Sequence, residues 1–265
     1  MTKSDYPRAL KAALTAARAA GALMRKNLDA TKKVNLRASH DIKLELDVRC
    51  QKLIERTLAK SFPEVAVLGE EGDSGHENPP SRWVIDPIDG TVNYAYGIPH
   101  ACVCIALQVR SNAKSARVDD GYATVVGVIY DPFLDEMWSA VAGDAARLNG
   151  KPIRVSPRAK LHDAIAAMGY GKNEQTMGEA LRVFRKLSRN TRKMRNMGAA
   201  GLALAYVATG RFDAYLERGI SIWDIAAGGF IVERAGGEFW RERMTGGGYR
   251  MIASNGRLRK QIQAL

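Results

Sequence analysis

The sequence predicts a layered α/β fold, and three observations support this prediction. The chain has 265 residues, 46% hydrophobic and 26% charged, which is enough to bury a large core. Apolar residues recur at helical spacing over residues 7–28, as expected for a first helix that docks on that core. Beyond residue 152, strand-like runs alternate with helix-like segments, which is the pattern of a layered α/β architecture.

The N-terminal segment is expected to contain two helices separated by a loop or turn over residues 30–42. The first helix is rich in Ala and Arg, like an organelle transit peptide, but acidic residues interrupt its basic character and favour a docked helix. A second helix is expected to follow Asp47 and to end at Pro63, because proline cannot continue a helix.

Two strands are expected to end in acidic residues. Residues 64–69 form an apolar run that delivers Glu70 and Glu71 at its end. The next apolar run should stop at Asp86, because Pro87 has no amide N–H to donate to a ladder. We therefore expect the acidic side chains of both strand ends to converge on one site.

The stretch Trp83–Asn93 carries the strongest chemical signal in the chain. Asp86 and Asp89 lie three residues apart, and Asp89-Gly90-Thr91 is expected to form a turn into a short helix, capped by Asp89. Carboxylate oxygens suit Mg²⁺, and the free amides of a helix start suit a phosphate group. The stretch thus predicts metal-assisted phosphate chemistry.

Alternatives remain for these acidic residues. The six residues from Asp86 to Thr91 are also compatible with a plain turn and a capping Asp. Phosphatases with an aspartyl nucleophile place their two Asp two residues apart, so the spacing of three favours two carboxylates shared between metal ions. Asp224, after Ser221, is expected at the start of an apolar helix, either as a site residue or as a helix cap.

The rest of the chain is expected to complete two halves, 1–150 with most metal ligands and 151–265 with Asp224 and the substrate-side residues, in one compact unit. The turn at 149–152 would join them. Strands are expected at 101–109, 124–130, 136–142, 164–168, 192–196, 213–217, 238–240 and 249–253, and helices at 175–189, 199–209 and 223–235.

Composition narrows the possible functions. No apolar run is long enough to span a bilayer, and three cysteines fit a reducing compartment, so a cytoplasmic protein is expected. Cys102 and Cys104 should share one face of a strand as buried thiols, since no second Cys or His cluster accompanies them.

A net charge of +12 raises nucleic acid as a partner. The densest basic run, Arg182–Arg195, contains one aromatic residue, Phe184, and no nucleic-acid motif. A solvated helix face is therefore the favoured interpretation of the run. The charge would also attract a phosphorylated substrate.

Five stretches, in this order, resemble the inositol monophosphatase family of magnesium-dependent, lithium-sensitive phosphatases: Asp41–Asp47, Gly69–Gly72, Trp83–Asn93, Arg195–Ala200 and Asp213–Gly237. The resemblance implies an αβαβα layered sandwich of the sugar-phosphatase type and a homodimer. The segment Leu36–His40 and Lys43 depart from the family pattern, which bears on a third metal and on lithium sensitivity.

The resemblance also implies a site with two or three Mg²⁺ ions. Glu70, Asp86 and the backbone carbonyl of Ile88 would hold the first ion. Asp86, Asp89 and Asp224 would hold the second ion. A third, more weakly bound ion would lie near Glu70, and Glu70 is therefore also expected to be a catalytic residue.

The remaining implied roles concern the substrate. Gly90 and Thr91 would receive the phosphate, and Asp47 with Thr91 would orient and deprotonate the attacking water. Glu217 and the backbone of Gly198-Ala199-Ala200 would line the alcohol side.

The resemblance therefore favours a phosphomonoesterase acting on inositol monophosphate or another small polyol or alcohol phosphate. The alternatives are a histidinol-phosphate, fructose-bisphosphate or 3′-phosphoadenosine nucleotide phosphatase, and a basic nucleic-acid-binding module without catalysis.

Overall fold

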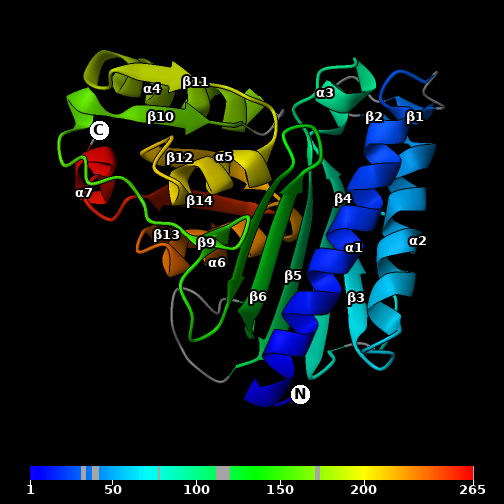
Figure 1. Ribbon diagram of the computed structural model, residues 1–265. Coiled ribbons are helices and arrows are strands. Elements are labelled where there is room, and N and C mark those ends of the chain that lie inside the picture. Colours follow the sequence, from blue (N-terminus) through cyan, green and yellow to red (C-terminus); the bar gives the residue numbers. More distant parts are fainter. Residues whose placement is uncertain (31–33, 38–41, 77, 112–119, 171–173, 265) are drawn as a thin grey trace.

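The computed structural model describes residues 1–265 except 31–33, 38–41, 77, 112–119, 171–173 and 265. Figure 1 shows five layers, in which helix pairs alternate with two sheets. Three buried apolar clusters fill the spaces between successive layers. The predicted layered α/β fold, and the αβαβα order that the family resemblance implied, are confirmed.

The outer layer consists of α1 (Tyr6–Asn27) and α2 (Glu45–Ala59), which cover one face of a seven-stranded sheet. The buried side of α1 is mostly alanine, and Gly21 lies on it near the C-terminal end of the helix. A Cβ atom on Gly21 would lie 2.5 Å from the Tyr130 ring, so the glycine lets the helix pack directly on the sheet.

The strand order of the seven-stranded sheet is β3-β4-β5-β6-β7-β8-β9, and only β3 and β4 are parallel. These strands are β3 (Ala66–Gly69), β4 (Ser81–Asp89), β5 (Cys102–Arg110), β6 (Tyr122–Asp131), β7 (Glu136–Val141), β8 (Arg147–Leu148) and β9 (Lys151–Pro152).

Two predictions for this part of the chain were wrong. The second helix begins at Glu45 rather than after Asp47, because the Asp47 carboxylate accepts the Leu44 N–H and so lies within the first turn. The expected loop over 30–42 contains a short antiparallel pair, β1 (Val34–Arg37) and β2 (Ile42–Leu44). Residues 38–41, which include Ser39, His40 and Asp41 of the family comparison, lie outside the described part of the chain.

A second, five-stranded sheet has the order β11-β10-β12-β14-β13. Its strands are β10 (Ile165–Met168), β11 (Lys193–Arg195), β12 (Ala214–Ile220), β13 (Glu238–Arg243) and β14 (Tyr249–Ser254). Helices α5 (Ala200–Ala208) and α6 (Ile222–Arg234) lie between the two sheets, whereas α4 (Glu174–Asn190) and α7 (Arg259–Gln263) cover the outer face. Almost every residue of α5 is buried, as expected for a helix enclosed on both sides.

Of the predicted turn at 149–152, only Asn149 and Gly150 form the turn, which joins β8 to β9; both have positive φ, as a tight hairpin turn requires. The strands of the seven-stranded sheet come from residues 66–152, and those of the other sheet come from residues 165–254. The division into halves at residue 150 stays a prediction.

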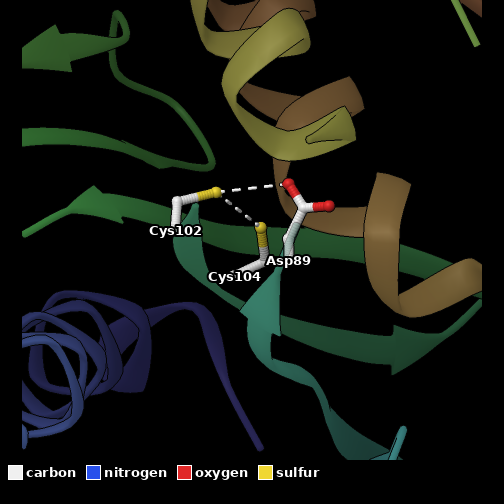
Figure 2. Close-up of side chains that lie close together, drawn as sticks. All are labelled: Asp89, Cys102 and Cys104. Carbon is white, nitrogen blue, oxygen red and sulfur yellow. Dashed lines mark hydrogen bonds between the residues drawn. The ribbon is translucent and has the colours of Figure 1, made fainter. Parts of the chain in front are cut away.

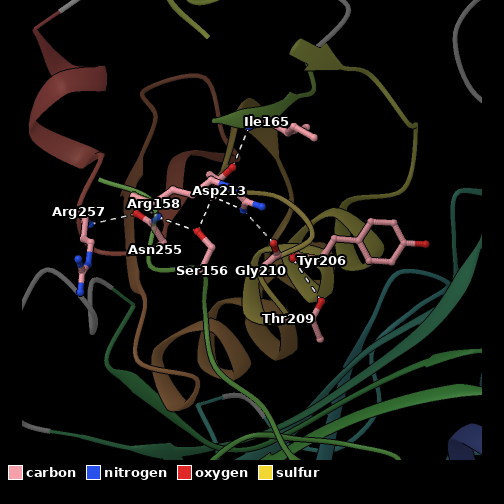
Figure 3. Close-up of polar contacts among 9 residues, drawn as sticks. All are labelled: Ser156, Arg158, Ile165, Tyr206, Thr209, Gly210, Asp213, Asn255 and Arg257. Atoms are coloured by element: carbon pink, nitrogen blue, oxygen red, sulfur yellow. Dashed lines mark hydrogen bonds and ion pairs between the residues drawn. The ribbon is translucent and has the colours of Figure 1, made fainter. Parts of the chain in front are cut away.

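A buried polar network fastens the segment after β9 to the second sheet (Figure 3). Asp213, fully buried, accepts hydrogen bonds from the Ser156 hydroxyl, from Arg158 Nη1 at 3.1 Å and from the Ile165 N–H at 2.8 Å. Asn255 donates to Ser156 Oγ at 3.0 Å and to the Arg158 carbonyl at 2.7 Å. One carboxylate therefore satisfies three donors, two from the segment after β9 and one from the start of β10, beside the start of β12.

We expect Asp213→Ala to lower the free energy of unfolding by about 3 kcal/mol, because three donors lose an acceptor that is itself fully buried. Urea denaturation measures this change. The control is Glu242→Ala, which removes an exposed ion pair to Arg250 and should cost less than about 1 kcal/mol. Equal losses in both variants would contradict the role given to the network.

Candidate functional site

The site begins with an irregularity in β4. Asp86 lies opposite Cys104 and Asp89 lies opposite Cys102, so β4 has one more residue than β5 in this interval. The prediction that the strand stops at Asp86 was wrong: it continues to Asp89, and the bulge accommodates Pro87. Residues three apart in a regular strand face opposite sides of the sheet, and the extra residue allows both carboxylates to face the same side.

Asp89 caps a helix, but not the adjacent one that was predicted. The short helix α3 (Thr91–Ala95) has Gly90 at its N-cap, with φ of 89°. Asp89 instead accepts the N–H groups of Ala200 (3.0 Å) and Gly201 (2.7 Å). These amides begin α5, so Asp89 connects β4 to a helix more than a hundred residues away in the sequence.

Asp86, Asp89 and Asp224 lie together: one carboxylate oxygen from each falls within 4.8 Å of the others. Asp224 is in the first turn of α6, where its Oδ2 accepts the Ser221 N–H at 2.8 Å. Glu70 follows β3, and its N–H donates to the Ile85 carbonyl at 3.1 Å, beside the same strand end. The structure thus brings together the three carboxylates predicted for one ion.

Burial and mutual repulsion raise the pKa values of this cluster. The pKa of Asp86 is raised well above its usual value by burial first, and then by the charges of Glu70, Asp89 and Asp224. Burial raises the pKa of Asp89 to about 6, although the N–H groups of Gly201 and Ala200 oppose the shift. Burial, then Asp89 and Glu70, raise the pKa of Asp224. Several buried oxygen donors of like charge form a donor set that fits a hard divalent cation.

Thr91 lies beside the bulge and has a local role that was not foreseen. The Thr91 hydroxyl donates to the Ile88 carbonyl at 2.8 Å, which places it beside the carbonyl assigned to the first ion. Asp47 is buried in the first turn of α2, and its catalytic role stays a prediction.

Asn93 is a structural residue of the site that the sequence analysis did not select. Its Nδ2 donates to the carbonyls of His100 (2.9 Å) and Met197 (2.8 Å), which fixes the loop that ends at Gly198. A Cβ atom on Gly90 would lie 2.9 Å from the His100 carbonyl and 3.2 Å from that of Gly198. The only signal for Asn93 in the sequence was its position at the end of the Trp83–Asn93 stretch.

A pocket of about 600 Å³ joins the residues predicted for the alcohol side of the substrate to two of the carboxylates, whereas Gly90 and Thr91 are not among its lining residues. Asp89, Asp224, Gly198–Ala200 and Glu217 all line it. Tyr215, which the sequence analysis did not select, lines the same pocket, and its hydroxyl group donates a hydrogen bond to the Glu217 carboxylate. The pocket is therefore lined by the Asp89 and Asp224 carboxylates and by Glu217, which is hydrogen-bonded to Tyr215.

The two cysteines of β5 lie directly beside Asp89 (Figure 2). Cys102 Sγ is 3.3 Å from Asp89 Oδ2 and 3.8 Å from Cys104 Sγ. Both thiols are free and fully buried, and burial raises the pKa of Cys102. The hydrogen bond with Cys102 lowers the pKa of Cys104, but burial and the charge of Asp89 outweigh it, so this pKa is also raised. The prediction of buried thiols on one strand face is confirmed, but their contact with Asp89 was not anticipated.

Comparison with known proteins agrees with this geometry. The model of the "Inositol monophosphatase family" matches residues 5–263. A protein of Pseudomonas aeruginosa named Nus factor SuhB is 37% identical over 236 residues, covering 86% of this chain and 83% of that protein. Inositol-1-monophosphatase of Rhizobium meliloti is 35% identical over 224 residues, covering 81% and 77%.

Solved structures show the same architecture. The inositol monophosphatase from Anabaena superposes with a TM-score of 0.81 and 32% identity, over 96% of this chain and 93% of that chain. The extragenic suppressor protein suhB from Bartonella henselae gives a TM-score of 0.85 and 32% identity, over 96% of both chains. With a family match over nearly the whole length, the chain belongs to the inositol monophosphatase family.

Proposed function

We propose that the protein is a Mg²⁺-dependent phosphomonoesterase acting on inositol monophosphate or a related small polyol phosphate. The observation that carries the proposal is the convergence of Asp86, Asp89 and Asp224 beside the 600 Å³ pocket. Family membership supports it, as does a 35% identical tomato relative named inositol monophosphatase 1.

Two or three Mg²⁺ ions fit the donor set. Glu70, Asp86 and the Ile88 carbonyl would hold one ion, and Asp86, Asp89 and Asp224 would hold another. When bound, such ions polarise the phosphate and make water a stronger nucleophile near neutral pH.

The chain's own groups would position the reactants. Gly90 and Thr91 would donate hydrogen bonds to the phosphate, and Asp47 with Thr91 would orient the attacking water and accept its proton. The bulge fixes Asp86 and Asp89, so little rearrangement is needed before phosphoryl transfer, a reaction that depends chiefly on positioning and charge.

Glu217 supports a polyol as substrate, because its carboxylate faces the pocket and can accept hydrogen bonds from hydroxyl groups. Its position is tightly constrained: a Cβ atom on Gly169 would lie within 2.6 Å of both carboxylate oxygens. The other small phosphate esters named above remain alternatives, because they share the same carboxylate chemistry.

The remaining expectations belong to the same proposal. A homodimer, lithium sensitivity and a cytoplasmic location are carried over from the sequence analysis and stay predictions. Among the described residues, no helix combines the length and the apolar character needed to cross a bilayer. The basic run lies on α4 and β11, where Arg182, Arg185 and Arg189 are exposed, in agreement with a solvated face.

Asp86→Asn should lower Mg²⁺-dependent phosphate release at least about 100-fold, because the substitution removes a charge from the metal-holding cluster. Phosphate release would be measured with a panel of phosphomonoesters, and circular dichroism would verify the fold. Asp144→Asn, on the exposed loop after β7, is the control and should retain activity. A wild-type protein that hydrolyses no phosphomonoester in Mg²⁺ would refute the proposed function.

The same variant should be more stable than the wild type in metal-free buffer at pH 7. Because the pKa of Asp89 is raised to about 6 and those of Asp86 and Asp224 are raised as well, the folded protein binds more protons than the unfolded chain above about pH 4. The wild type should therefore lose stability as pH rises through this range, and Asp86→Asn should lose less. Thermal unfolding at pH 4 and 7, with and without Mg²⁺, measures this; a wild-type advantage at pH 7 without metal would contradict it.

Glu217→Gln should raise KM for inositol monophosphate about tenfold, because a charged hydrogen-bond acceptor is lost on the alcohol side. The effect on phenyl phosphate, which has no ring hydroxyls, should be several-fold smaller. Steady-state kinetics with both substrates checks the difference. Equal changes for the two substrates would remove Glu217 from substrate selection.

A further inference from the structure

A second group of ligand atoms adjoins the carboxylate cluster. Asp89, Cys102 and Cys104 each place one oxygen or sulfur atom within 4.8 Å of the other two. We propose that these three residues bind a soft divalent cation such as Zn²⁺ or Cd²⁺, and that this cation competes with Mg²⁺ for Asp89. Two sulfur donors and one carboxylate suit such cations, whereas the neighbouring cluster contains only oxygen donors.

The distances between the donor atoms agree with tetrahedral zinc. A Zn–S bond is about 2.3 Å, so two sulfurs at tetrahedral angles lie about 3.8 Å apart. Cys102 Sγ and Cys104 Sγ are 3.8 Å apart. A Zn–O bond of about 2.1 Å predicts roughly 3.6 Å between sulfur and oxygen, and Cys102 Sγ is 3.3 Å from Asp89 Oδ2. Little movement of the donor atoms is therefore required.

The three donor atoms also lie together against the backbone of Gly201. A Cβ atom on that glycine would lie 2.4 Å from Cys104 Sγ, 3.0 Å from Cys102 Sγ and 3.1 Å from Asp89 Oδ2. Glycine at position 201 therefore lets the donor atoms pack this closely against the start of α5.

The position of Asp89 explains how a cation would reach the two sulfurs and how its binding would affect the Mg²⁺ site. It lines the 600 Å³ pocket, so a cation that reaches the pocket meets Asp89 before the buried sulfurs. Binding exchanges two S–H bonds for two metal–sulfur bonds and releases two protons to solvent, with no change of oxidation state. Because Asp89 also belongs to the carboxylate cluster, a soft cation on the sulfur side would withdraw a ligand from the Mg²⁺ site.

Cobalt and zinc binding to the full-length, reduced, Mg²⁺-free protein test this proposal. Co²⁺ should produce a thiolate-to-metal charge-transfer band that saturates at one equivalent and is abolished by Zn²⁺. Cys102→Ser and Cys104→Ser should each weaken Zn²⁺ binding by at least about tenfold. Cys50→Ser is the matched control, because Cys50 is equally buried but lies on α2, and it should leave the band unchanged.

X-ray absorption on the zinc-loaded wild type needs no variant and should count two sulfur ligands. A spectrum with fewer than two sulfurs, or a band that persists in both Cys102→Ser and Cys104→Ser, would overturn the proposal. Excess Mg²⁺ should weaken Zn²⁺ binding in the wild type; no effect would overturn the shared role of Asp89. These readouts do not depend on turnover, so a protein that hydrolyses no phosphomonoester but shows the band would refute only the proposed phosphatase function.

Discussion

The bulge at the end of β4 is the constraint on which the site depends. One extra residue between Asp86 and Asp89 allows two carboxylates to face the same side of the sheet, and it accommodates Pro87. Asp89 then accepts two amide hydrogens from the start of α5, which fixes the position of the helix that lies between the sheets. The same interaction therefore shapes the site and holds two layers of the fold together.

The cluster of Asp86, Asp89 and Asp224 lowers the stability of the folded protein when its carboxylates are ionised. Asp86 and Asp89 are almost completely buried, and their pKa values are raised because ionisation in that place is unfavourable. Well-satisfied interactions elsewhere, such as the Asp213 network and the alanine-rich contact of α1, offset this cost. Divalent cations would relieve the repulsion, so metal binding and stability are coupled in the proposed function.

Asp89 occupies a boundary between two kinds of donor. On one side lie carboxylates suited to hard cations, and on the other lie the sulfurs of Cys102 and Cys104. The β4–β5 ladder pairs Asp86 with Cys104 and Asp89 with Cys102, which brings the two donor sets together at the same bulge. Under the two proposals, Asp89 makes the Mg²⁺ site sensitive to thiophilic metals.

Local pattern alone determined most of the longer helices and strands, the helical stripe of α1, the acidic strand ends and the buried thiols, because each depends on periodicity or on residues close in sequence. It did not predict the short strands β1, β2, β8 and β9. Family resemblance added the five layers and the grouping of Asp86, Asp89 and Asp224. Only the tertiary structure decided that Asp89 caps α5 rather than α3, that Asn93 holds the Gly198 loop, and that Tyr215 binds Glu217. A bulge and a long-range hydrogen bond depend on which strands and helices become neighbours, and the spacing of residues within one segment does not specify those neighbours.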